Sequence, residues 1–465
     1  MHRSNPNIRI PDDVRETVLK IIRRFRDRGH ECYLIGGSVR DLLLGNEVYD
    51  YDFATDARPE EITALFRKTI PTGIKHGTVS AIVDDRQFEI TTYRSDGTYI
   101  DGRHPDTVTF SKDLRVDVER RDFTINGLVY DPASGELIDY VGGLRDLEEK
   151  IIRTIGDPVM RFTEDGLRPV RACRFAARLK FTIEDTTFNA IAATLEISRK
   201  VSKERIRDEL MKLLEADKPS IGIEYLRQSG LLALFLPELA DCYEVSQNRY
   251  HIHDVYYHSI YSCDAAPKHD PMIRLAALLH DIGKIPTRQP GEDGDFTFYN
   301  HEVIGAKMVK RVMKRLKFSN EQVDCVNNLI LNHMFHYTDE WTDGAVRRFI
   351  RKVGLDKIDS LFTLRMADRK GNGARKGLPA PIERLKRRIE HVIEQENAFT
   401  VRDLDINGTI LMDEFGLKPG PLIGTILNEL LELVLDNPEL NIRETLLSRA
   451  RDIIDRHGKT PGAID

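Results

Sequence analysis

The sequence lacks the features that mark several special classes of protein. It contains one tryptophan and five cysteines in 465 residues, and no window approaches the ~18 consecutive apolar residues of a membrane span. The cysteines are widely scattered, with no close pair of the kind that binds zinc. The first residues have no apolar core and no small-residue cleavage site, which argues against a secretory signal. We therefore expect reduced thiols in a cytoplasmic protein that does not associate with membranes.

Neither sign of charge dominates the composition. Lysine and arginine number 69 against 75 aspartate and glutamate, so the net charge of −6 excludes a histone-like polycation. Hydrophobic residues at 41% and charged residues at 31% exclude a disordered or collagen-like chain. Two local stretches, 161–180 and 365–390, are nonetheless strongly basic. Taken alone, each would attract a polyanion or simply form a solvated helix face.

The pattern of apolar residues divides the chain into two kinds of structure. Up to about residue 150, short β-branched and alternating runs are interleaved with helical segments, which is typical of an α/β fold. Beyond it the periodicity is helical almost throughout, including one continuous helix expected over 160–180. The length suits three or four domains of ~100–150 residues each. The sequence therefore predicts an α/β head followed by an all-α body.

A first candidate site lies in the head. Asp50 and Asp52 are two residues apart on a predicted strand, so both carboxylates leave the same face. They follow a pair of glycines, Gly36 and Gly37, at the start of a predicted helix, where backbone amides and the helix dipole can hold a triphosphate. Paired carboxylates can hold Mg²⁺ ions, which stabilise both the attacking and the leaving oxygen of an in-line displacement. Glu89, on a neighbouring predicted strand, is either a third carboxylate of this site or an outward-facing polar residue.

Asp165 and Arg168 are a second pair with two interpretations. Three residues apart on the predicted helix, they share one face. A carboxylate and a guanidinium in this arrangement can meet donor and acceptor positions on the pairing edge of a base. The simpler alternative is an ion pair within the helix, and the spacing alone favours that alternative.

Four segments within the first 235 residues resemble, in order, the motifs of class II tRNA nucleotidyltransferases. This family comprises the bacterial CCA-adding enzymes and the poly(A) polymerases. The segments are GGSVRDLLLGNEVYDYDFATDA (36–57), ERRDFTINGLVYD (119–131), the stretch 142–179 around EDGLRPVR, and VSKERIRDELMKLL (201–214). The resemblance implies a head of the polymerase-β type, a helical neck, and transfer of nucleotides to RNA without a template.

The same resemblance implies a role for each matching residue. By this resemblance Asp50 and Asp52 would bind Mg²⁺, while Glu89 stays a candidate catalytic carboxylate on the strength of its neighbouring strand alone. The nucleotide-binding set would place Gly36, Gly37 and Arg40 on the triphosphate, Arg121, Asp122 and Asn126 at the ribose, and Glu164, Asp165, Arg168 and Arg171 in the segment that reads the base. The implied division is a catalytic head over 1–150, a neck over 151–245, a further helical domain over 246–372 and a helical tail over 373–465.

A second candidate site lies in the body, where histidines and aspartates recur on predicted helices. They are His258, His280, Asp281, His301, His333 and Asp368. A single histidine on an apolar helix is usually a packed core residue. An adjacent His-Asp pair, together with spaced histidines and a downstream aspartate, instead suits a first-row divalent metal.

Residues 250–370 resemble the HD phosphohydrolase superfamily, in its HDIG subtype. The resemblance implies a metal quartet of His258, His280, Asp281 and Asp368, with His301 and His333 completing a second position for a divalent transition metal. His251 and His253 do not match a ligand position. Such a domain is either a working phosphodiesterase or a structural metal or RNA-docking module. The resemblance does not settle which.

Together these resemblances predict addition of CMP, AMP or both from CTP and ATP to the 3′ end of tRNA, with release of pyrophosphate. The segment 92–110 resembles a flexible loop that implies AMP addition, and the tail with the basic stretch 365–390 is a candidate tRNA-binding surface. Alternatives are an A-adding enzyme or poly(A) polymerase of the same family, and a metal phosphohydrolase with an RNA-binding head. The sequence does not determine the oligomeric state.

Overall fold

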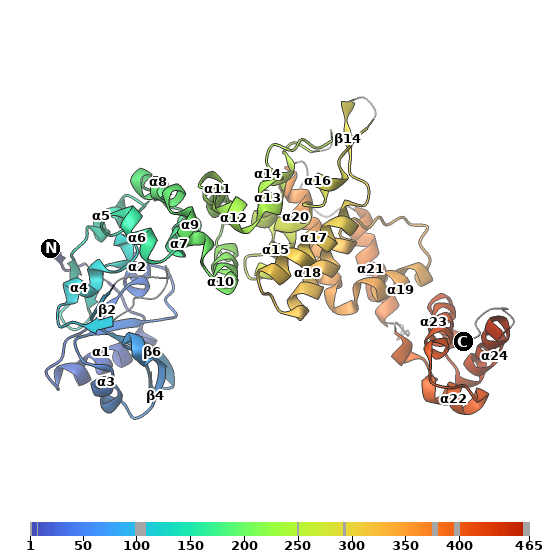
Figure 1. Cartoon of the computed structure of the whole chain (residues 1–465). Helices are drawn as coiled ribbons and strands as arrows, with labels where there is room; N and C mark the ends of the chain where they lie inside the picture. The colour runs from blue at the N-terminus through green and yellow to red at the C-terminus, as the bar shows by residue number, and fades with distance from the viewer. Residues whose placement is uncertain are drawn as a thin grey trace. The chain divides into compact units, whose positions relative to one another are not determined.

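The computed structural model describes residues 2–6, 8–97, 108–248, 251–291, 294–373, 380–394 and 400–458 (Figure 1). Most of the loop expected to influence the choice of nucleotide, 98–107, lies outside these ranges, as do residues 374–379 of the second basic stretch. The chain forms two compact units. The first comprises Met1–Tyr243 and Val312–Phe318, and the second comprises Glu244–Arg311 and Ser319–Asp465.

The first unit begins with an eight-stranded sheet in the order β1-β10-β9-β2-β3-β6-β5-β4. The strands are β1 (His2–Ser4), β2 (Cys32–Ile35), β3 (Asp52–Thr55), β4 (Thr69–Gly73), β5 (Thr78–Val83), β6 (Arg86–Thr92), β9 (Val129–Asp131) and β10 (Glu136–Asp139). All neighbouring pairs are antiparallel except β3 and β6, which run parallel with Asp52 beside Glu89. The two candidate carboxylates are thus placed side by side by strand pairing.

Helices and a small core support this sheet. Helix α1 (Asp12–Arg26) buries one face, from Val14 and Val18 to Ile21 and Phe25, at the 3.6-residue spacing of an amphipathic helix. The other helices of the head are α2 (Gly37–Leu43), α3 (Pro59–Leu65), α4 (Leu114–Glu119) and α5 (Gly143–Glu148), and a short ladder pairs β7 (Arg94–Asp96) with β8 (Val108–Phe110). The sheet ends at residue 139, so the predicted α/β head is confirmed.

The rest of the first unit is mostly helical. Its elements are α6 (Pro158–Glu164), α7 (Arg168–Leu179), α8 (Asp185–Ala193), α9 (Leu195–Arg199), α10 (Lys203–Leu214), α11 (Pro219–Gln228), α12 (Leu231–Phe235) and α13 (Pro237–Ala240), with β11 (Ile151–Ile152) paired to β12 (Thr182–Ile183).

The prediction of one continuous helix over 160–180 is wrong, because the chain breaks between α6 and α7. Asp165 has an extended backbone, with φ −140° and ψ 108°. Pro169 lacks an N–H, and in a continuous helix its ring would clash with the carbonyl of Asp165, four residues earlier. At Gly166, a Cβ would come within 2.6 Å of the Ile197 carbonyl oxygen, so the break packs tightly against the backbone near α9. Asp165 and Arg168 therefore do not lie on one helix.

The second unit is also mostly helical. It contains α14 (Val255–Ala265), α15 (Pro271–Leu279), α16 (Lys284–Thr287), α17 (His301–Arg315, whose end belongs to the first unit), α18 (Asn320–Asn332), α19 (Asp343–Val353), α20 (Ile358–Gly371), α21 (Ala380–Glu394), α22 (Gly408–Phe415), α23 (Pro421–Asp436) and α24 (Arg443–Gly458). One two-stranded ladder, β13 (Gln289–Pro290) with β14 (Phe296–Thr297), interrupts the helices. None of the described helices combines the length and apolar character that crossing a membrane would require.

Candidate active site and metal centre

A cavity of about 430 Å³ in the first unit gathers most of the predicted nucleotide-binding residues. It is lined by Gly36, Gly37, Arg40, Asp52, Arg121, Asp122, Asn126, Asp165, Arg168 and Arg171. Sequence reasoning missed four further arginines that line it, Arg120, Arg174, Arg178 and Arg205. Eight arginines against three aspartates make this cavity a strong attractor of anions.

The turn between β2 and α2 forms one wall of the cavity. Gly36 has φ +80°, in the left-handed region that favours glycine, and a Cβ there would come within 3.2 Å of Nη1 of Arg121. Arg40, on the next turn of α2, is only 3% exposed, and its Nη1 donates to Oδ1 of Asn126 at 2.5 Å. The turn therefore brings backbone and a fixed guanidinium to the same edge of the cavity.

Asp122 anchors the middle of the cavity. Its Oδ2 accepts from Nε and Nη2 of Arg171 at 2.9 and 2.6 Å, and its Oδ1 accepts from Nδ2 of Asn126 at 3.0 Å. Burial acts to raise the pKa of Asp122, but Arg171 and these hydrogen bonds hold it well below its usual range. Asp122 is therefore an anion that fixes both Arg171 and Asn126.

Phe175 on α7 supports the arginines through its ring. The guanidinium carbons of Arg174, Arg40 and Arg171 lie 4.1, 5.0 and 5.5 Å from the ring centroid. Arg174 also donates through Nε to the buried carboxylate of Glu209 on α10 at 2.6 Å. Contacts to the ring and to acidic partners hold the like-charged guanidinium groups close together.

The two predicted base-reading residues both line the cavity, but they do not pair with each other. Asp165 accepts from Nη1 and Nη2 of Arg205 on α10 at 3.1 and 2.7 Å. Arg168 instead bonds to the carboxylate of Glu164, which is not among the lining residues. The alternative of an ion pair within one helix is thus wrong. The break between α6 and α7 gives each residue its own partner and leaves both at the cavity surface.

Asp52 lines this cavity, and two further carboxylates, Asp50 and Glu89, lie close enough to influence its pKa. The pKa of Asp52 is raised to about 6, chiefly by burial; Glu89 and Asp50 also raise this pKa, and Arg121 opposes the rise. Asp50 lies two residues before the start of β3, so the prediction that it shares a strand with Asp52 is wrong, and it lines a separate cavity of about 560 Å³. Carboxylates that repel one another are stabilised when their oxygen atoms bind a divalent cation. The residues present therefore fit a hard cation such as Mg²⁺.

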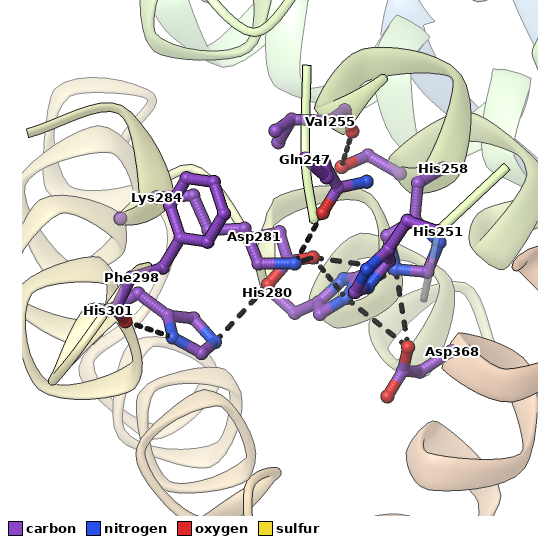
Figure 2. Close-up of polar contacts among 12 residues, drawn as sticks. Gln247, His251, Val255, His258, His280, Asp281, Lys284, Phe298, His301 and Asp368 are labelled. Carbon is purple, nitrogen blue, oxygen red and sulfur yellow. Dashed lines mark hydrogen bonds and ion pairs between the residues drawn. The ribbon is translucent and has the colours of Figure 1, made fainter. Parts of the chain in front are cut away.

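A second constellation lies in the second unit, where four predicted ligands come together from three helical regions (Figure 2). Nε2 of His258 on α14 lies 3.2 Å from Nε2 of His280, 3.2 Å from Oδ1 of Asp368 on α20, and 3.4 Å from Oδ2 of Asp281. His280 and Asp281 directly follow α15. Ligand atoms of His258, His280 and Asp368 lie within 4.8 Å of one another, a spacing that one metal ion could bridge.

The remaining two histidines extend the cluster to a second position. Nε2 of His301 lies 3.4 Å from Oδ1 of Asp281 and 3.4 Å from Nε2 of His333. His280, Asp281 and His333 form a second group of mutually close ligand atoms. Burial and, to a smaller extent, nearby His280 together lower the pKa of His333 to about 3, so this imidazole is neutral and offers a lone pair. The donor set suits a first-row divalent metal at two adjacent positions.

Hydrogen bonds orient three of the rings. The Nδ1 atoms of His280, His301 and His333 lie 2.8, 2.8 and 2.7 Å from the carbonyl oxygens of Ala277, Phe298 and Ile330. Each Nδ1 must donate in such a contact, so in the neutral ring Nε2 is the unprotonated atom, and it is directed at the cluster. This is the tautomer that metal ligation by Nε2 requires.

Sequence reasoning missed several residues around this cluster. Lys284 donates to Asp281 at 2.7 Å and to Gln247 at 2.6 Å, and Arg365 donates to Asp368 at 2.8 Å. His251 packs edge-on against His258 and, with Lys284 and Arg365, lines a cavity of about 440 Å³ whose wall also includes most of the histidine and aspartate cluster. We call it the metal cavity. Lys284 follows the His-Asp pair by only three residues, a spacing that could have identified it.

Comparisons with known proteins find matches to the parts of the chain that contain both sites. Three family models match the chain: "Poly A polymerase head domain" over residues 32–153, "Probable RNA and SrmB- binding site of polymerase A" over 180–243, and "HD domain" over 250–372. The CCA-adding enzyme of Lactococcus lactis subsp. lactis (strain IL1403) is 33% identical over 448 residues, which cover 93% of this chain and 96% of that protein. The CCA-adding enzyme of Ligilactobacillus salivarius (strain UCC118) is 32% identical, over 96% of this chain and 98% of its own length.

Solved structures agree with this similarity. The crystal structure of the Bacillus stearothermophilus CCA-adding enzyme in complex with CTP matches with a TM-score of 0.73 and 26% identity, over 97% of this chain and 100% of that one. The Thermotoga maritima CCA-adding enzyme complexed with tRNA matches with a TM-score of 0.56 and 21% identity, over 96% and 97% of the two chains, which shows a shared fold.

Proposed function

This chain belongs to the family of CCA-adding enzymes, which are nucleotidyltransferases, and we propose that it adds CMP from CTP and AMP from ATP to the 3′ end of tRNA in the cytoplasm. Each addition would release pyrophosphate. The observation that carries this proposal is the arginine-lined cavity beside Asp52 and Glu89, because a triphosphate needs cationic partners next to the carboxylates where it reacts.

In this proposal the catalytic chemistry belongs to the head, residues 1–150. Asp50, Asp52 and Glu89 hold Mg²⁺, which, when bound, neutralises phosphate charge and activates the attacking hydroxyl. Arg40 and the amides of the turn at Gly36 and Gly37 bind the triphosphate. Arg121, Asp122 and Asn126 contact the ribose, with Arg171 held in place by Asp122.

The neck, residues 151–245, selects the base. Cytosine and adenine both present an amino donor next to a ring-nitrogen acceptor, whereas uracil and guanine present the reverse order on the same edge. The Asp165 carboxylate accepts from the amino group and the Arg168 guanidinium donates to the ring nitrogen. Arg205 and Glu164 support the proposal, because they fix these two side chains while leaving them at the cavity surface.

A second activity is assigned to residues 246–372, where the histidine and aspartate cluster favours a divalent transition metal. His258, His280, Asp281 and Asp368 hold one ion, with His301 and His333 at a second position. Such ions, when bound, would activate water for the hydrolysis of a phosphate ester. Lys284 and Arg365 place positive charge where the ester's phosphate binds. The tail, 373–465, with the basic stretch 365–390, contributes to holding tRNA.

A nucleotide-addition assay tests the first activity. Purified protein receives tRNA ending in CC with ATP alone, and tRNA lacking CCA with CTP alone. Extension of both supports full CCA addition, whereas extension of only the first indicates an A-adding enzyme. Unlimited A addition to the tRNA ending in CC would indicate a poly(A) polymerase, and no addition to either tRNA would refute the proposal. An Asp52→Asn variant provides the catalytic control.

A further inference from the structure

Arg178 is the most exposed of the eight arginines that line the cavity of about 430 Å³ in the first unit, which we call the nucleotide cavity. It lies in the last turn of α7, and 50% of its side-chain surface is exposed, against 32% for Arg171 and 3% for Arg40. The proposed function gives Arg178 no role. Its contacts nevertheless set it apart from the other arginines of the wall.

The other seven arginines are each held by a carboxylate. Arg168 bonds to Glu164, and six more place a nitrogen within 3.0 Å of a carboxylate oxygen: Arg40, Arg120, Arg121, Arg171, Arg174 and Arg205. Arg178 has a longer contact, 3.5 Å from its Nη2 to Oδ2 of Asp41. A hydrogen bond of this length is weak, so the guanidinium of Arg178 is loosely held.

Asp41 is already bound to Arg40. Its Oδ1 accepts from Nε of Arg40 at 3.0 Å and its Oδ2 accepts from Nη2 of Arg40 at 2.8 Å. This bidentate arrangement is the one that best fits a guanidinium to a carboxylate. Asp41 is only 6% exposed. One buried carboxylate therefore faces two guanidinium groups, which leaves one positive charge unbalanced in this part of the wall.

Asp117 also faces two arginines, but the charge there is balanced. It bonds to Arg120 at 2.7 Å and to Arg121 at 3.0 Å. Asp52 supplies a second negative charge, and its pKa is lowered more by Arg121 than by Arg40. Among the described residues, Arg178 has no carboxylate other than Asp41 within ion-pair distance. The excess positive charge of the cavity is therefore greatest beside Arg178.

The substrate of the proposed reaction supplies an anion for this position. Most of the charge of a nucleoside triphosphate is on its outer two phosphates, and a guanidinium binds phosphate oxygens well. The proposed function assigns Arg40 to the triphosphate. Because Arg40 and Arg178 both contact Oδ2 of Asp41, their guanidinium groups reach the same end of the cavity.

We propose that Arg178 binds the outer two phosphates of the incoming CTP or ATP, and then the pyrophosphate that leaves. Its guanidinium exchanges the long contact with Asp41 for a phosphate oxygen, while Arg40 keeps Asp41 satisfied. The assignment rests on the proposed function for the identity of the substrate. The contact itself forms without nucleotide addition, so it can be measured in the absence of tRNA.

Isothermal titration calorimetry of the full-length protein, with Mg²⁺ and without tRNA, tests the contact directly. Arg178→Ala should weaken binding of CTP and of inorganic pyrophosphate about tenfold. Binding of CMP should not change, because CMP lacks the outer phosphates. ATP should lose as much affinity as CTP, since the contact does not involve the base. Arg178→Lys keeps the positive charge and should retain part of the affinity.

Steady-state nucleotide addition provides a second readout. Arg178→Ala should raise the KM for CTP and for ATP about tenfold, while the preference for CTP over UTP and the KM for tRNA stay unchanged. Arg199→Ala is the matched control. Arg199 is also an exposed arginine of the first unit, paired with Glu196 at 3.2 Å, but it is not part of the cavity wall. Its removal should change none of these constants.

Unchanged affinity of Arg178→Ala for CTP and pyrophosphate, or an equal loss of affinity for CMP, would overturn the proposal. A raised KM for tRNA with an unchanged KM for CTP would also overturn it, and would indicate that Arg178 contacts the RNA backbone. If the wild-type protein adds no nucleotide but the calorimetric differences are found, the proposed function fails and phosphate binding by Arg178 stands. The two failures are therefore distinguishable.

Discussion

Replacing Asp122 by Asn tests whether the nucleotide cavity is held together by one buried charge. Asp122 is 8% exposed and bonds both to Arg171 and to Asn126. The amide keeps the shape and an acceptor but removes the charge that balances Arg171. Breaking a buried ion pair in this way costs about 3 kcal/mol of unfolding free energy. Urea denaturation followed by circular dichroism, with amide hydrogen exchange in α7, measures this loss.

The lowered pKa of Asp122 determines how the difference in stability between wild type and Asp122→Asn changes with pH. Because the folded-state pKa of Asp122 lies below its ordinary value of 3.8, its stabilising contribution is complete above that value and is lost as the pH falls toward the folded-state pKa. The variant lacks this contribution at every pH. The stability gap between wild type and Asp122→Asn should therefore be constant near neutrality and narrow in acid.

Asp13→Asn is the control, because Asp13 pairs with Arg86 at a similar 2.8 Å in the same unit but with both side chains largely solvent-exposed. Its denaturation midpoint should hardly move. A loss below about 1 kcal/mol for Asp122→Asn, or a gap that stays the same at about pH 3 and pH 7, would refute the reasoning.

Three further predictions concern the two sites. Asp52→Asn and Glu89→Gln should each lower kcat of nucleotide addition about 10³-fold while tRNA affinity, measured by filter binding, is retained; unchanged kcat would reject the carboxylate assignment. Arg205→Ala should release the carboxylate it orients and reduce the preference for CTP over UTP about tenfold in single-nucleotide addition; an unaltered preference would make Arg205 purely structural. A double change of His280 and Asp281 to Ala should abolish bound transition metal, measured by elemental analysis, and any phosphodiesterase activity. Nucleotide addition should survive in this variant, and its collapse in a folded protein would contradict independent sites.

The sequence predicted the parts of these sites that depend on short-range pattern. The Gly36–Gly37 turn and the strand containing Asp52 each follow from a few adjacent residues, and a His-Asp pair after an apolar helix is visible in the same way. The predicted α/β head and mostly helical body are confirmed for the same reason, since periodicity is a local property.

The missing parts depend on contacts between distant residues. Arg205 meets Asp165 across 40 positions, and β1 pairs with β10 across more than 130, and neither pairing has a local signature. The break before α7 was predictable, because Pro169 forbids a helix through Asp165, but the apolar periodicity on both sides outweighed that signal.

The three histidines whose Nδ1 atoms contact carbonyl oxygens have a consequence for how such a domain can evolve. In each case the acceptor belongs to the residue three positions earlier, so the ring is oriented by its own turn of backbone. No side chain from another helix is needed to choose which nitrogen faces the cluster. Substitutions elsewhere can therefore erode the surrounding pocket, and with it any hydrolysis, while the ability to bind metal persists. A protein descended from such an enzyme could therefore retain the metal ion in a structural role after it has lost phosphate-ester hydrolysis.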